Sequence, residues 1–177
     1  KMTKNLFKLI LFTTIITPTL AVGQLPPKQL KESGQWVAFK YGQNKDKVCY
    51  VSSIPIKMTG KYKKRGQSYI MVSHRPLDKP PTLNVFEHRA GYTYKKGSEV
   101  TVEIGNQKFR LYTSTDSAWA KDSKTDENLV RSMIKGNKMV LRGTSNRGTK
   151  TVDTYSLSGF TATFRASAKA CKLKKTL

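Results

Sequence analysis

The chain of 177 residues carries 33 Lys and Arg but only 11 Asp and Glu, which gives a formal net charge of +22 at pH 7. Such a charge attracts polyanions and anionic membrane surfaces, whereas two histidines and few acidic residues leave little capacity for a metal centre. The alternative is a lysine-rich surface that is merely solvated.

The first residues, 1–23, have the order of a secretory signal peptide. Three lysines come first, then an apolar run over 9–16, then a region of small residues. The run is shorter than the roughly 20 residues that a transmembrane helix needs. We therefore expect cleavage after Ala21 or Gly23, one mature domain over 24–177 and no membrane-spanning segment in it. The alternative is an uncleaved helix that tethers the domain to the inner membrane.

Cys49 and Cys171 are the two cysteines of the chain. An even number of cysteines in an exported protein indicates a disulfide, and only one pairing is possible. The alternative is a pair of free thiols.

Short segments rich in Val, Ile, Tyr, Phe and Thr follow the lead segment 24–34, and Gly, Pro, Asn and Asp separate them. This pattern predicts a mainly β domain with a small helical component. The predicted strands cover 36–41, 47–54, 68–74, 82–88, 100–104, 108–113, 139–143 and 151–156.

A hairpin is the clearest local prediction. Residues 105–106 are Gly-Asn, a two-residue turn between two alternating segments. Pairing across this turn places Val102 opposite Phe109 on the apolar face and Glu103 opposite Lys108 on the other. The opposite charges support this register.

Two helices are predicted in the C-terminal third. Thr125 is expected to cap the first, which ends at Gly136, and Ser158 is expected to cap the second. The second helix would carry Cys171 back onto the strand that holds Cys49. The apolar positions are Leu129, Val130, Met133 and Ile134 in the first helix, and Phe160, Phe164 and Ala168 in the second.

Residues suited to catalysis are scarce. His74 and His88 lie near predicted strand ends, where we expect satisfied surface side chains. Ser156 and Ser158 lack the pattern of a nucleophile elbow. We therefore expect no catalytic residue, no metal, no cofactor and no enzymatic activity. The alternative is an envelope enzyme that uses His88 with Glu87.

The segment 57–66 concentrates five cations around one tyrosine between two glycines. On a loop between strands it would project these charges toward phosphate or carboxylate groups, and the alternative is a solvated hairpin tip. The turn 143–148 could also hold an anion, although a plain loop is favoured, and a basic tail follows the second helix. The candidate binding residues are Lys61, Tyr62, Lys63, Lys64 and Arg65, and the tail comprises Lys169, Lys172, Lys174 and Lys175.

Short motifs occur in the order found in one known family: Trp36, 48–50, 71–76, 91–92, 118–120, Met133 with Gly136, 143–148, 153–160 and the final Cys171. The most diagnostic is Ser-Leu-Ser-Gly-Phe at 156–160, followed by a helix and a cysteine. The mature chain thus resembles the invasion-associated locus B family. The resemblance implies an immunoglobulin-like β-sandwich exported to the envelope of alphaproteobacteria, with Cys49 and Cys171 matching the family's cysteines. The family is named for a role in host-cell invasion and has no agreed catalytic residues.

Export and charge together suggest the class of partner. We expect a non-enzymatic protein of the periplasm or cell envelope of a Gram-negative bacterium. Its partner would be an anionic envelope component (lipopolysaccharide, acidic lipid or polysaccharide) or an acidic protein, and nucleic acid is not expected. The alternative in a different class is an adhesin that acts on a host surface.

Overall fold

The computed structural model describes residues 26–174 and Leu177, so the predicted signal peptide over 1–23 lies outside the described residues. Within them, eleven strands form one antiparallel sheet of order β1-β2-β3-β5-β6-β9-β8-β7-β10-β11-β4, and two α-helices are present. The elements are β1 (Lys28–Ser33), β2 (Trp36–Tyr41), β3 (Val48–Ser53), β4 (Lys57–Gly60), β5 (Tyr69–Arg75), β6 (Thr82–Arg89), β7 (Glu99–Ile104), β8 (Gln107–Ser114), β9 (Ser117–Trp119), α1 (Ser123–Lys135), β10 (Lys138–Thr144), β11 (Lys150–Ser156) and α2 (Phe160–Ala170).

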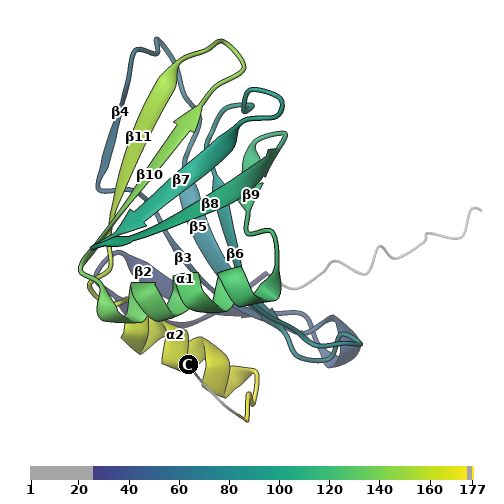
Figure 1. Ribbon diagram of the computed structural model, residues 1–177. Helices are drawn as coiled ribbons and strands as arrows, with labels where there is room; N and C mark the ends of the chain where they lie inside the picture. The colour runs from purple at the N-terminus through teal and green to yellow at the C-terminus, as the bar shows by residue number, and fades with distance from the viewer. Residues whose placement is uncertain (1–25, 175–176) are drawn as a thin grey trace, which may run out of the picture.

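The sheet folds back on itself. Figure 1 shows β7, β8, β10 and β11 lying in front of β5 and β6, while both helices lie together at the lower end. Apolar side chains from both parts of the sheet fill the space between them and are completely buried. The mainly β fold class with short helices is therefore confirmed, in a sandwich-like arrangement. The largest of these buried side chains are Trp36, Phe86, Tyr155 and Phe160.

All eight predicted strands are present, but β1, β4 and β9 were not predicted. β1 has the sequence KQLKES, in which Leu30 alone packs against the core. β4 is exposed at every position, and β9 has three residues. The edge strands β1 and β4 bury too little apolar surface to show an alternating pattern. β9 lies between β6 and β8 and is too short to show one.

The predicted hairpin register is confirmed. Val102 pairs with Phe109, and Glu103 pairs with Lys108 in strands β7 and β8. The Lys108 ammonium lies 3.3 Å from the Glu103 carboxylate.

The first predicted helix begins earlier than expected. The cap of α1 is Asp122, whose carboxylate accepts a hydrogen bond of 2.7 Å from the backbone N–H of Thr125. Thr125 was therefore wrongly predicted as the cap, because an acidic side chain three residues earlier already satisfies its amide. The predicted stop at Gly136 is confirmed. No helix in the described part of the chain is long and apolar enough to cross a membrane.

The second helix also has a different start from the predicted one. The residue before α2 is Gly159, with φ 89°, rather than Ser158. A Cβ atom at Gly159 would collide with the carbonyl oxygen of Ser33 on β1, so only glycine fits this close approach. Phe160 then packs edge-on against Trp36, with 4.8 Å between the ring centroids.

A disulfide joins the end of α2 to β3. Cys49 and Cys171 are bonded to each other, 122 residues apart in sequence, and both are buried. The predicted pairing is confirmed. The bond closes nearly the whole domain into one loop.

Removing the disulfide should destabilise the domain. In a Cys49→Ala, Cys171→Ala variant we expect the free energy of unfolding to fall by about 2–5 kcal/mol, because the unfolded chain regains the freedom that the long loop denied it. Urea denaturation measures the change. Wild-type protein unfolded under reducing conditions is the control and should match the variant; equal stability of variant and oxidised wild type would contradict the prediction.

Candidate functional site

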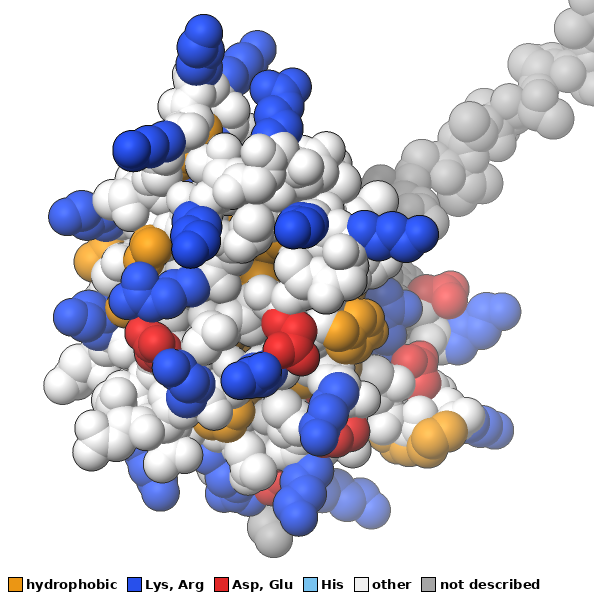
Figure 2. Space-filling view, turned by 45° about the horizontal axis from the view of Figure 1, so that its top comes forward, with side chains coloured by type: hydrophobic (Ala, Val, Ile, Leu, Met, Phe, Trp, Pro, Cys, Tyr) orange, Lys and Arg blue, Asp and Glu red, His pale blue; other side chains and the backbone are white. Residues whose placement is uncertain are grey.

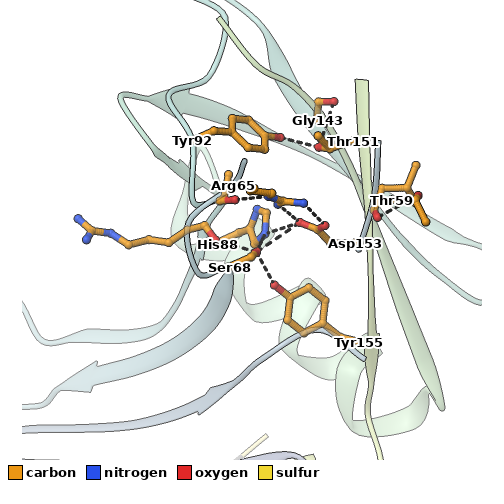
Figure 3. Close-up of polar contacts among 12 residues, drawn as sticks. Thr59, Arg65, Ser68, His88, Tyr92, Gly143, Thr151, Asp153 and Tyr155 are labelled. Carbon is orange, nitrogen blue, oxygen red and sulfur yellow. Dashed lines mark hydrogen bonds and ion pairs between the residues drawn. The ribbon is translucent and has the colours of Figure 1, made fainter. Parts of the chain in front are cut away.

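A buried ion pair links the two facing parts of the sheet. Burial alternates along β11, so Asp153 points inward together with Thr151 and Tyr155. The guanidinium of Arg65 donates to both carboxylate oxygens of Asp153, at 2.6 and 2.5 Å, and its Nε donates to the carbonyl oxygen of Ala90 at 2.7 Å. Both charged side chains are 2% exposed. Figure 3 shows them meeting between β11 and the end of β6.

Hydrogen bonds extend from this pair through His88. Its Nε2 lies 3.3 Å from Asp153 Oδ2, and its Nδ1 lies 2.7 Å from the hydroxyl of Tyr94. Because a carboxylate only accepts hydrogen bonds, Nε2 carries the proton and the Tyr94 hydroxyl donates to Nδ1. Ser68 donates to the carbonyl oxygen of Arg89 at 2.9 Å and lies 3.0 Å from the Tyr155 hydroxyl. These contacts give the buried polar groups of the cluster hydrogen-bond partners.

The charges in the cluster follow from its burial. Burial lowers the pKa of His88 and outweighs the effect of the neighbouring Asp153 carboxylate, so the imidazole is neutral. Burial alone would raise the pKa of Asp153, but hydrogen bonds from His88 and Arg65 bring that pKa below its ordinary value. Burial also raises the pKa of Tyr94 and of Tyr155. The cluster therefore contains one cation and one anion.

The cluster contains the residue types of a catalytic triad in a different geometry. Ser68 and Asp153 both approach Nε2 of His88, at 3.1 and 3.3 Å, whereas a triad places nucleophile and carboxylate on opposite ring nitrogens. Ser68 is 1% exposed. Glu87 points to the other face of β6 and accepts a hydrogen bond from Ser117 at 2.9 Å. His88 and Glu87 thus do not share one site.

Both histidines were wrongly predicted to lie on the surface. His74 is fully buried, its Nδ1 accepts a hydrogen bond from the backbone N–H of Asn84 at 3.1 Å, and its ring packs edge-on against Phe164 of α2. Burial lowers the pKa of His74 to about 4. The sequence gives no local sign of this burial, because the covering groups come from α2 for His74 and from β11 for His88.

The predicted binding segment 57–66 divides into three parts. Residues Lys57–Gly60 form β4, paired with β11, and are not a loop. Arg65 does not project as predicted, because Asp153 holds it inside, with the guanidinium carbon 4.9 Å from the ring centre of Tyr92. The side chains that do face solvent are Lys61, Lys63 and Lys64, and Tyr62 is half-buried.

A groove of about 740 Å³ lies between this segment and the turn from β10 to β11. Both segments considered for anion binding, 57–66 and 143–148, thus contribute to one hollow, which we call the basic groove. No Asp or Glu from the described ranges lines it. Its lining residues include Lys61, Tyr62, Lys63, Lys64, Tyr92 and Arg147, and a neighbouring hollow adds Lys150.

The charge distribution on this side of the molecule agrees with the groove. Figure 2 shows lysine and arginine side chains projecting at the top of the view without acidic side chains among them. The basic tail is separate, because Lys169 lies in the last turn of α2 and Lys172 just after it, at the lower end of the molecule. β4 and the β10–β11 turn lie at the upper end (Figure 1). Lys175 lies outside the described residues.

A model of the invasion-associated locus B (IalB) protein family matches residues 36–168, well over half of the chain. The chain belongs to the IalB family. The match covers the groove, the buried cluster and both helices except the end of α2. IalB membership and the disulfide are consistent with an exported envelope protein. Comparisons with curated proteins and with solved structures found no significant match.

No group of three or more His, Cys, Asp or Glu side chains able to hold a metal ion occurs within residues 26–174. The candidate site in this IalB chain consists of the basic groove and the ion pair beneath it. The sequence pointed to the lysines through their clustering. It contained no signal for the inward direction of Arg65, since that depends on Asp153, 88 residues later.

The ion pair should show strong coupling in a double-mutant cycle. Asp153→Asn leaves the buried Arg65 cation unpaired, and Arg65→Met leaves the Asp153 carboxylate unpaired, so each should cost about 3–5 kcal/mol of unfolding free energy. The double variant should cost clearly less than the sum. Urea denaturation of the four proteins tests this, and additive costs would show that the two side chains act independently.

His74 should make the domain less stable in mild acid. An unfolded chain protonates this ring at a pKa near 6.5, whereas the folded ring stays neutral to about pH 4. The neutral His74 ring therefore makes its full contribution to the free energy of unfolding above pH 6.5. That contribution falls by about 3 kcal/mol as the pH drops to 4. His74→Asn retains an acceptor for Asn84 but does not titrate, so urea denaturation should show a weaker pH dependence. His88 also has a lowered pKa, but it contributes the same pH dependence to the wild type and to the His74→Asn variant. Identical pH dependence would contradict the assignment.

Proposed function

We propose that this IalB-family chain is a non-enzymatic binding module of the cell envelope, whose basic groove binds phosphate or carboxylate groups of an anionic envelope component. Family membership supports an invasion-associated locus B family role. The observation that carries the proposal is the meeting of segment 61–66 with the β10–β11 turn in a groove without acidic side chains.

The chemistry of the groove suits a polyanion. Lys61, Lys63 and Lys64 are exposed and offer mobile ammonium groups, while Arg147 from the facing turn offers a guanidinium. Thr149 and Asn146 add neutral hydrogen-bonding groups to the same lining. Repeated phosphates, as in lipopolysaccharide or a layer of acidic lipid, would engage several of these cations at once. An acidic protein presents a less regular array of charges and is the alternative partner.

Export supports an envelope partner over nucleic acid. The disulfide is typical of proteins that fold in an oxidising compartment, and the predicted signal peptide agrees with it. The absence of a triad geometry in the buried cluster supports a binding role. The hydrogen bonds from Arg65 to Asp153 and to the Ala90 carbonyl hold segment 61–66 in place.

Removing the groove cations should weaken binding to anionic envelope material. We expect a Lys61→Gln, Lys63→Gln, Lys64→Gln, Arg147→Gln variant to bind lipopolysaccharide and phosphatidylglycerol vesicles at least about tenfold more weakly at 0.1 M salt, since each cation near an anionic surface contributes about 1 kcal/mol. Co-sedimentation measures the affinity, and wild-type binding should weaken as salt is raised.

A control variant should remove the same charge elsewhere. Lys28, Lys31, Lys121 and Lys124 are equally exposed and lie on β1 and near the start of α1. Their replacement by Gln should have a much smaller effect. Equal losses in both variants would show that total charge, and not the groove, attracts the polyanion, and this would refute the proposed site.

A further inference from the structure

Three large apolar side chains are exposed on β4 and in the segment just before it. Ile54, Ile56 and Met58 are 46%, 56% and 42% exposed. Ile54 and Ile56 lie just before β4, with Ile56 at a bend, and Met58 is the second residue of the strand. Met58 lies opposite the inward-facing Asp153 in the register of β4 and β11. Met58 thus lies on the continuation of the inner face of the sheet, and we call Ile54, Ile56 and Met58 the apolar strip.

The surroundings of the apolar strip are cationic. Between residues 54 and 66 there are four exposed lysines, the buried Arg65 and no Asp or Glu. Lys57 points to the opposite face of β4, Lys61 continues the strand, and Arg147 with Lys150 adjoins the same end. Figure 2 shows hydrophobic side chains exposed between lysine and arginine side chains at the left of this face. Exposed apolar groups next to a cluster of cations match an anionic bilayer, which offers acyl chains beneath negative headgroups.

We propose that the apolar strip Ile54, Ile56 and Met58 inserts into the interface of an anionic lipid bilayer, while the neighbouring lysines contact the headgroups. This inference rests on the proposed function and narrows its partner to a lipid surface. The apolar side chains bind by leaving water, and the lysines bind by charge. Long lysine side chains place their ammonium groups at the headgroup level while their methylene stems lie against apolar surface.

A second copy of the chain fits this edge less well. β4 pairs only with β11 among the described strands, so its other edge is open. Antiparallel pairing of two β4 strands would bring Lys57 and Lys61 of one copy close to the same lysines of the other. Like charges opposite each other destabilise strand pairing, and lysine on an edge strand is a known protection against it.

The test compares two serine variants. Ile56→Ser, Met58→Ser should bind vesicles containing phosphatidylglycerol about tenfold more weakly than wild type, since two apolar side chains no longer leave water on binding. This loss should persist at 0.5 M salt. Leu77→Ser is the matched control, because Leu77 is 51% exposed on the turn between β5 and β6, far from β4 in Figure 1. It should bind as wild type does.

A fluorescent reporter tests insertion directly. Tryptophan introduced as Ile56→Trp should be quenched by brominated acyl chains in anionic vesicles, and Leu77→Trp should not. Wild-type affinity in Ile56→Ser, Met58→Ser, with weakened binding in the groove-cation variant, would overturn insertion and leave the proposed function standing. A wild-type protein that binds no anionic vesicle and no lipopolysaccharide would overturn both. Loss of a dimer in sedimentation of the serine variant, with vesicle binding unchanged, would assign the strip to self-association and overturn insertion.

Discussion

The ion pair between Arg65 and Asp153 determines where the basic groove lies. Alternation along β11 directs Asp153 into the core. Burying its carboxylate without a partner would cost more free energy than the net folding stability of a typical domain. Arg65 neutralises it and also hydrogen-bonds the carbonyl oxygen of Ala90. To reach that place, segment 61–66 has to cross from the β4 edge toward the end of β6. The lysines before Arg65 are thereby held against the β10–β11 turn.

The segment uses its two kinds of cation for different purposes. Arg65 stays charged when buried, and its planar guanidinium matches the two oxygens of Asp153 while its face lies against Tyr92. Lys61, Lys63 and Lys64 face water, where an ammonium group keeps its hydration and remains available to an anion. Counting charges along the sequence treats these residues as equivalent. In the folded protein Arg65 is part of the core, and its contacts fix the position of the three lysines before it.

Much of the fold could be predicted because it depends on local patterns. The hairpin between β7 and β8, the eight main strands and the pairing of two cysteines require only alternation, turn residues and a count. The edge strands β1 and β4 lack that alternation, since they bury few side chains. The burial of His74 under Phe164, and of Arg65 against Asp153, depends on elements more than 80 residues apart in sequence. No local pattern indicates such contacts, so both side chains were predicted to lie on the surface.

Strand β4 meets two physical requirements with the same residues. An exposed edge strand invites pairing with another chain, and lysines along it oppose that pairing by repulsion. Ile56 and Met58 lie on the same edge, and without the lysines they would favour aggregation. The cations therefore allow this protein to keep an uncovered apolar strip in water. A negatively charged surface cancels the repulsion while accepting the apolar side chains, so the same arrangement that prevents self-association favours contact with an anionic bilayer.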